Sequence, residues 1–131
     1  MDKKLKDSLS KIKLLICDID GVLTDGSFIK STSGEELRSF NALDGVGFVM
    51  LRLLNLNIKT AWITGRESLT TTQRAEELQI DDVYNGVIRK IDAYDELKKK
   101  YEVSDSEVCF IGDDIIDIPI LEKVGFAVTV P

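Results

Sequence analysis

The sequence predicts an α/β fold, in which helices cover both faces of a mainly parallel β-sheet and form a three-layer sandwich. Short apolar runs rich in β-branched residues alternate along the chain with longer segments whose apolar residues recur every three or four positions. Strands and helices that alternate in this way typically form one parallel sheet. Residues with carboxylate or hydroxyl groups directly follow several of the apolar runs, which is where such sheets bind ligands.

The length of 131 residues, of which 44% are hydrophobic, predicts a single domain over residues 1–131. The formal net charge of −6 argues against general binding to nucleic acid or anionic membranes, because the protein's field repels phosphate-rich polymers. Residues 1–13 are charged and contain no hydrophobic signal region, and the apolar runs have only the length of strands. We therefore expect a cytoplasmic protein with neither nucleic acid nor membrane as a partner.

The sequence contains no histidine. This excludes phosphohistidine intermediates, histidine general bases and the common zinc sites. The two cysteines, Cys17 and Cys109, lie in predicted strands, where a free cysteine usually packs as a small apolar side chain. No arginine follows either cysteine at the short spacing that a cysteine phosphatase needs. Hydrolytic chemistry would therefore depend on carboxylates, lysine, hydroxyls and a metal ion.

The first predicted strand, residues 12–18, ends at two carboxylates, Asp18 and Asp20. Side chains two residues apart in an extended chain point to the same side, so these two could converge beyond the strand end. Two carboxylates at such a short distance repel one another unless a cation lies between them. Mg²⁺, which prefers oxygen ligands, is the natural cation for such a pair.

A β-hairpin is predicted directly after this acidic turn. Residues 27–30 and 36–40 would form its arms, and residues 31–34, Ser-Thr-Ser-Gly, would supply its turn. The hairpin could project over the acidic site as a flap.

A helix is predicted from Asp44, as its N-cap, to about Leu54. Its apolar residues recur at helical spacing, so we expect them to pack in the core. This stripe comprises Val46, Val49, Met50, Leu53 and Leu54.

The rest of the chain continues the alternation of strands and helices. Further strands are expected at residues 58–63, 83–84, 107–111 and 126–130, and further helices at residues 68–78, 90–101 and 119–124. The helix over residues 68–78 would turn Leu69, Thr72, Ala75 and Leu78 inward. Asn85 and Gly86 mark a turn before the next helix.

Polar side chains follow three of these strands. Asp18 ends the first strand, Thr64 follows residues 58–63, and Asp113 follows residues 107–111. The carboxyl ends of parallel strands lie at one edge of the sheet, so residues far apart in the sequence can meet there in one crevice.

Four segments resemble, in order, the motifs of the haloacid dehalogenase superfamily of phosphatases. They are residues 18–26, Asp-Ile-Asp-Gly-Val-Leu-Thr-Asp-Gly; residues 63–66, Ile-Thr-Gly-Arg; Lys90; and residues 112–119, Gly-Asp-Asp-Ile-Ile-Asp-Ile-Pro. The resemblance covers nearly the whole chain and implies a Rossmann-like three-layer fold. It is nearest to a branch of small phosphosugar phosphatases acting on 3-deoxy-D-manno-octulosonate 8-phosphate, from lipopolysaccharide biosynthesis, or on related nonulosonate 9-phosphates.

The resemblance also implies a role for each motif residue. Asp18 would attack phosphorus and form an aspartyl-phosphate, and Asp20 would act first as general acid and then as general base. Lys90 would neutralise Asp18 and the charge that develops during transfer. Contacts with the phosphate and the phosphorylated sugar acid would come from Asp20, Gly21, Thr64, Gly65, Arg66 and Lys90, although Arg66 could instead reach a second subunit.

Mg²⁺ is the cofactor that the resemblance implies. Asp18, the backbone carbonyl of Asp20, and Asp113 would hold it, with Asp114 or Asp117 nearby and some contacts made through water. The ion would let an anionic carboxylate approach an anionic phosphate.

The intervals between the motifs leave no room for a cap domain, so the expected protein is a capless phosphatase. The resembling branch closes such an open site with neighbouring subunits of a homotetramer, and we expect the hairpin within residues 22–40 to take part. Two departures from that branch concern the substrate. A C-terminal Gly-Gly-containing segment does not follow residues 128–131, and Leu43 precedes Asp44 where the branch typically has arginine.

Two alternative functions use a similar set of residues. A receiver domain of a signalling protein also places aspartates, a threonine and a lysine at strand ends, but its lysine comes last, whereas here Lys90 precedes residues 112–114. A binding or scaffold protein could keep the same fold with weak or no turnover.

Overall fold

Five parallel strands form the central sheet of the computed structural model, which describes residues 2–131. Their order across the sheet is β5-β4-β1-β6-β7. The strands are β1 (Leu14–Cys17), β4 (Lys59–Ile63), β5 (Asp82–Tyr84), β6 (Val108–Ile111) and β7 (Phe126–Val128). All four pairings are parallel, which confirms the predicted sheet. Several strands are shorter than the sequence suggested.

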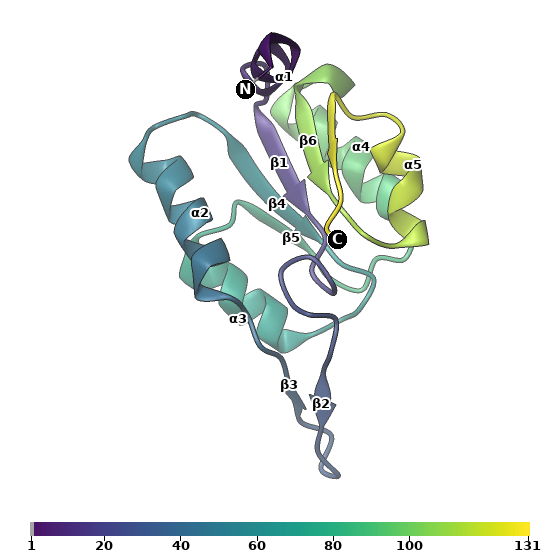
Figure 1. Cartoon of the computed structure of the whole chain (residues 1–131). Helices are drawn as coiled ribbons and strands as arrows, with labels where there is room; N and C mark the ends of the chain where they lie inside the picture. The colour runs from purple at the N-terminus through teal and green to yellow at the C-terminus, as the bar shows by residue number, and fades with distance from the viewer. Residues whose placement is uncertain (1) are drawn as a thin grey trace.

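Helices cover both faces of this sheet (Figure 1). The helices α2 (Ala42–Leu53) and α3 (Leu69–Leu78) lie on one face, and α4 (Lys90–Tyr101) and α5 (Ile118–Leu121) lie on the other. The short helix α1 (Lys3–Leu9) precedes β1 and buries no residue. The three-layer α/β sandwich is therefore confirmed. Over residues 2–131, no helix combines the length and the apolar character needed to cross a membrane.

The strands divide their side chains between two cores because alternate residues point to opposite faces. On β4, Ala61 and Ile63 pack with Tyr94 of α4. Trp62, which lies between them, packs with Phe48 of α2 on the opposite face. The two aromatic rings meet edge to face with centroids 5.7 Å apart.

The predicted hairpin is present and extends away from the carboxyl edge of the sheet (Figure 1). Its strands are β2 (Ile29–Lys30) and β3 (Glu36–Leu37), which pair in antiparallel fashion. Both Ile29 and Leu37 are exposed. The hairpin therefore places apolar side chains on the surface.

Helix α2 differs from the prediction in its cap and in its buried face. Asn41, not Asp44, is the N-cap, and its side chain accepts a 2.9 Å hydrogen bond from the backbone N–H of Leu43. The residues that face inward are Gly45 and Phe48. In the predicted stripe, Val46 is 54% exposed and Leu53 is 71% exposed, and Met50 and Leu54 are exposed too.

Gly45 explains why the predicted apolar stripe of α2 does not face the core. A pattern of apolar residues does not reveal a glycine that packs closely against a neighbouring helix. A Cβ at Gly45 would lie 2.8 Å from Arg74 Nη2 and 3.2 Å from Leu78 Cδ2. The missing side chain therefore lets α2 approach α3 closely, and this turns the other apolar face of α2 outward.

Helix α3 begins after Ser68 as predicted, but its inner face is rotated. Ala75 and Leu78 are buried, whereas Leu69 is 72% exposed and Thr71 is buried in its place. Thr71 Oγ1 accepts a hydrogen bond from Arg38. The hydroxyl groups of α3 thus face polar partners, which a hydrophobic pattern does not reveal.

Candidate active site

The carboxyl ends of β1, β4 and β6 bring the predicted polar residues to one edge of the sheet. Asp18 follows β1, Thr64 follows β4, and Asp113 lies just beyond β6. A cavity of about 490 Å³ opens at this edge. Its lining consists of Asp18, Asp20, Gly26, Phe28, Thr64, Gly65, Arg66, Ile88, Lys90, Asp114 and Ile116. Most of the predicted site residues therefore share one cavity.

Lys90, the first residue of α4, is almost fully buried between two carboxylates. Its Nζ lies 2.8 Å from Asp18 Oδ1 and 2.7 Å from Asp117 Oδ1. A buried ammonium group requires such partners, because its desolvation is otherwise too costly. Asp18 and Asp117 therefore hold the cation of Lys90 beside the cavity.

Asp18 is buried and makes one further contact, a 2.7 Å hydrogen bond that its Oδ1 accepts from the backbone N–H of Ile19. Burial raises the pKa of Asp18 to about 6, against the opposing effect of the Lys90 charge. The carboxylate is therefore mostly ionised at neutral pH, which is the form that can act as a nucleophile.

Three carboxylates gather at the end of β1 and β6. One oxygen from each of Asp18, Asp113 and Asp117 lies within 4.8 Å of the other two. Burial, followed by the negative charges of Asp117 and Asp114, raises the pKa of Asp113. A hard divalent cation would relieve this repulsion, and oxygen ligands of this kind suit Mg²⁺. The donor set therefore fits such an ion.

Asp117 differs from the other two acids because protein donors occupy both of its carboxylate oxygens. Its Oδ2 accepts hydrogen bonds of 3.1 Å from the backbone N–H groups of Asp113 and Asp114, and its Oδ1 pairs with Lys90. Asp117 thus shapes the loop that carries Asp113. Asp114 lines the cavity, and its Oδ1 accepts a 2.6 Å hydrogen bond from the N–H of Ile115.

Gly21 lies against the metal-ligand candidates. Its φ is +90°, and a Cβ at this position would lie only 2.0 Å from Asp113 Oδ2. Glycine is therefore required both by the backbone conformation and by the close approach of Asp113. The sequence predicted Gly21 as a phosphate contact, and the structure places it beside Asp113.

Asp20 faces an arginine that the sequence did not identify as part of the site. Arg38 Nη1 lies 3.3 Å from Asp20 Oδ1, and Nη2 donates a 3.4 Å hydrogen bond to Oδ2. Arg38 comes from the hairpin arm after β3. The only signal in the sequence is its spacing from Glu36, which puts both on one side of an extended arm.

Thr64 is buried, and its Oγ1 accepts a 3.3 Å hydrogen bond from the backbone N–H of Arg66. The Arg66 guanidinium lies over the ring of Phe28 at 3.7 Å from the centroid and 3.6 Å from Glu36 Oε2. Arg66 thus joins the end of β4 to the hairpin. Phe28 and Glu36 were not predicted as parts of the site.

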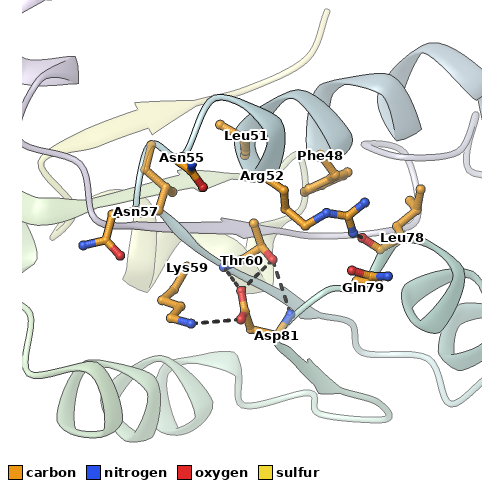
Figure 2. Close-up of a pocket in the computed structure, with 11 residues that line it drawn as sticks. Phe48, Leu51, Arg52, Asn55, Asn57, Lys59, Thr60, Leu78, Gln79 and Asp81 are labelled. Carbon is orange, nitrogen blue, oxygen red and sulfur yellow. Dashed lines mark hydrogen bonds and ion pairs between the residues drawn. The ribbon is translucent and has the colours of Figure 1, made fainter.

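A second cavity, of about 250 Å³, lies at the opposite, amino-terminal edge of the sheet (Figure 2). Asp81 Oδ2 accepts hydrogen bonds from the N–H and the hydroxyl of Thr60, and Asp81 Oδ1 accepts one from Lys59. These polar groups satisfy one another. They fasten the start of β4 to the segment before β5.

The fold and the site together define a class: a Rossmann-like α/β protein with a buried aspartate–lysine pair and an acidic cluster at the carboxyl ends of its strands. A model of the haloacid dehalogenase-like hydrolase family matches residues 55–131. The chain belongs to this family, as its resemblance to the superfamily motifs predicted.

Two relatives show the extent of the similarity. The 3-deoxy-D-manno-octulosonate 8-phosphate phosphatase KdsC of Salmonella typhi is 42% identical over 119 residues, and that of Escherichia coli K12 is 41% identical. Each alignment covers 91% of this chain, which spans 62% of the length of these relatives.

Solved structures agree with this relationship. The 3-deoxy-D-manno-octulosonate 8-phosphate phosphatase of Yersinia pestis superposes with a TM-score of 0.93 at 38% identity, over 98% of this chain and 69% of that one. The Moraxella catarrhalis phosphatase, solved with magnesium ion, phosphate ion and KDO, gives 0.93 at 34% identity, over 100% of this chain and 74% of that one.

Proposed function

We propose that this chain is a Mg²⁺-dependent phosphomonoesterase that forms an aspartyl-phosphate on Asp18. One observation carries the proposal: Lys90 Nζ lies 2.8 Å from the buried Asp18 carboxylate, beside Asp113 and Asp117. An ionised carboxylate next to a fixed cation and a metal-compatible acidic cluster suits phosphoryl transfer, in which charge must be neutralised. Family membership favours this function over the receiver-domain alternative.

The proposed substrate is 3-deoxy-D-manno-octulosonate 8-phosphate or a related nonulosonate 9-phosphate. The names of the two KdsC relatives support the first of these, as does the Moraxella catarrhalis structure with KDO. Arg66 lines the cavity and would offer its cation to the sugar acid. The phosphosugar would enter the cavity with its phosphate toward Asp18.

In the first step, an Asp18 oxygen would form a bond to phosphorus while the bond from phosphorus to the sugar oxygen breaks. Asp20 would give its proton to the departing sugar oxygen. In the second step, water would attack the same phosphorus and lose a proton to Asp20, and inorganic phosphate would leave Asp18 free. The charge of Lys90 stabilises Asp18 and the transferred group, while Thr64 and the N–H groups near Gly65 would bind phosphoryl oxygens.

Asp18, Asp113 and the backbone carbonyl of Asp20 would hold Mg²⁺, with Asp114 and Asp117 nearby. When bound, the ion would supply the positive charge that lets a carboxylate approach a phosphate dianion. Asp117 would act mainly on the loop, because its oxygens already accept hydrogen bonds from two backbone amides and Lys90.

The decisive experiment measures phosphate release from a panel of phosphosugars and aryl phosphates, with Mg²⁺ and with EDTA. We expect release with Mg²⁺ only, and no release by Asp18→Asn, which keeps the size of the side chain and removes its nucleophilic charge. Full activity in this variant or in EDTA would refute the mechanism. Activity on aryl phosphates alone would refute the substrate, and Mg²⁺ binding without turnover of any ester would favour the scaffold alternative.

We also propose that residues 1–131 form one capless phosphatase domain that assembles as a homotetramer in the cytoplasm. The connections between strands of the described residues contain a hairpin and single helices, which supports the capless form. The exposed hairpin residues Ile29 and Leu37 support assembly, as does the outward apolar face of α2. The free, buried cysteines Cys17 and Cys109 are in keeping with a reducing compartment.

Light scattering after size-exclusion chromatography tests the assembly. We expect the mass of a tetramer for the wild type and a smaller mass for Leu53→Glu, which puts a charge on the apolar face of α2. Leu69→Glu is the matched control, because Leu69 is equally exposed on α3 and lies outside that face. A monomeric wild type would contradict the proposal.

A further inference from the structure

Resting on the proposed function, we infer that Arg38 is a positioning residue for the proton transfers: it holds the carboxyl group of Asp20 in the orientation from which the protonated acid gives its proton to the leaving oxygen and the carboxylate then takes a proton from water. Arg38 has no part in the bond-making and bond-breaking steps of the proposed reaction. Its side chain is fully buried although it belongs to the arm of a projecting hairpin. A guanidinium buried in such a place requires partners that compensate its charge.

The guanidinium faces Asp20 as a two-pronged fork. Its Nη1 lies 3.3 Å from Asp20 Oδ1, and its Nη2 donates to Asp20 Oδ2 at 3.4 Å. Two parallel contacts of this kind fix the plane of a carboxylate, which a single point charge would not do.

Two further contacts fix the guanidinium itself. Arg38 Nη1 donates a 3.1 Å hydrogen bond to Thr71 Oγ1 on α3, and Nε donates a 3.1 Å hydrogen bond to Glu36 Oε1 on β3. The fork is therefore anchored to a helix and to the hairpin at once. Because its rotation is restricted, the carboxylate that it faces is restricted too.

One carboxylate oxygen of Asp20 relies on Arg38 to compensate its burial. Among residues 2–131, Asp20 Oδ1 is buried and accepts no hydrogen bond of good geometry, so its ion pair with Arg38 is the contact that stabilises it there. A buried polar oxygen without a partner is destabilising. Removal of the Arg38 cation would therefore let the carboxylate rotate out of this position.

Direct binding of phosphate by Arg38 is a poorer explanation of its burial. Arg38 does not line the cavity, whereas Lys90 and Arg66 do. Its charge is also already matched by Asp20 and Glu36. The contacts thus direct Arg38 toward the general acid and not toward the transferred phosphoryl group.

The test compares substrates whose leaving groups differ in their need for a proton. A sugar or alkyl oxygen is a poor leaving group and needs a proton as the bond to phosphorus breaks, whereas p-nitrophenolate leaves without one. The quantity to compare is kcat/KM, because it covers the steps up to the phosphorylated enzyme. For Arg38→Met with Mg²⁺ present, we expect about a 100-fold loss on sugar and alkyl phosphates and less than about a threefold loss on p-nitrophenyl phosphate.

Three further variants complete the experiment. Arg38→Lys keeps the charge but not the fork, so it should recover only part of the loss on alkyl phosphates. Thr71→Val removes one anchor of Arg38 and should give a smaller loss with the same dependence on leaving group. Arg52→Met is the neutral control, because Arg52 bonds to the Leu78 carbonyl at the opposite edge of the sheet.

A loss in Arg38→Met that is equal for alkyl and p-nitrophenyl phosphates would overturn the inference and leave the proposed function standing. A wild type that hydrolyses neither class would overturn the proposed function, and the inference with it. If Arg38→Met does not fold, as judged by circular dichroism, the Arg38→Lys and Thr71→Val variants decide by the same comparison.

Discussion

Lys90 Nζ lies 2.8 Å from Asp18 Oδ1, and both side chains are buried at the carboxyl edge of the sheet. The same ammonium group also pairs with Asp117, which holds the loop of Asp113. One cation therefore supports the proposed nucleophile and the acidic loop together. Its removal should affect catalysis and stability at once.

For Lys90→Met, we expect phosphate release to fall by at least about 100-fold, because the charge that stabilises phosphoryl transfer is lost. Two buried carboxylates would lose their partner, which should lower the free energy of unfolding by about 3–5 kcal/mol. Phosphate assays and urea unfolding measure the two effects. The double variant Lys90→Met/Asp117→Asn should regain stability but not activity. Unchanged stability in the single variant would contradict the role of the buried pair.

Gly21→Ala tests the close packing of the loop against Asp113. A Cβ would lie 2.0 Å from Asp113 Oδ2, so we expect about a 100-fold loss of activity as the displaced carboxylate leaves its place in the site. Gly34→Ala is the matched control: its φ is also +90°, but nothing lies within 4 Å of the added Cβ. Both variants should lose about 1–2 kcal/mol from backbone strain. Equal activities in the two would show that the Asp113 contact is unimportant.

Mg²⁺ should stabilise the protein, because it would bind the folded acidic cluster and not the unfolded chain. At a concentration 100-fold above its Kd, the expected gain in unfolding free energy is about 2.7 kcal/mol. Asp113→Asn should abolish most of this gain, whereas Asp114→Asn should retain more of it. Urea unfolding with and without Mg²⁺ provides the measurement. Similar gains in Asp113→Asn and the wild type would argue against Asp113 as a ligand.

The edge-to-face contact between Phe48 and Trp62 should be a main source of stability on the α2 and α3 face. Phe48→Ala removes a buried ring, and we expect it to lower the unfolding free energy by about 3–5 kcal/mol. The control Leu69→Ala shortens an exposed side chain and should change it by less than about 0.5 kcal/mol. A comparable effect of the two substitutions in urea unfolding would refute this account of the core.

Glu107 should contribute to the sensitivity of the fold to acid. Its contacts with Lys13 Nζ, at 2.5 Å, and with the N–H of Ser104 lower the pKa of Glu107 from 4.5 to about 2. Because the folded pKa lies below the unfolded value, this stabilisation is present above pH 4.5 and is lost as the pH falls toward 2. Glu107→Gln should therefore lose less unfolding free energy than the wild type over that range.

Urea unfolding between pH 2 and pH 5 compares the two proteins over the range of this titration. Glu122→Gln, an exposed change at the end of α5, serves as the control and should follow the wild type. The prediction fails if the unfolding free energies of Glu107→Gln and the wild type have the same pH dependence.

Much of the fold and of the candidate site could be predicted because the relevant patterns are local. Asp18, Thr64 and Asp113 follow apolar runs directly, and the geometry of a parallel sheet then brings them to one edge. Lys90 could be assigned only through the resemblance to known motifs. Its burial depends on Asp117, 27 residues further along the chain.

Other features could not be predicted, because they depend on how elements pack. The apolar residues of α2 have helical spacing on two faces, and Gly45, which has no side chain, decides which face meets α3. Arg38 and Phe28 belong to a hairpin whose path back to the sheet edge has no signature in the local sequence.

The sequence by itself determined the order of strands and helices, the family, and the acids, hydroxyl and lysine that meet at the sheet edge. Periodicity and strand-end position are properties of neighbouring residues, so they can be recognised before folding. Only the tertiary structure decided that Asp20 faces Arg38 and that α2 turns an apolar face outward. Both depend on contacts between segments distant in the chain, and such contacts form only when the three layers and the hairpin pack together.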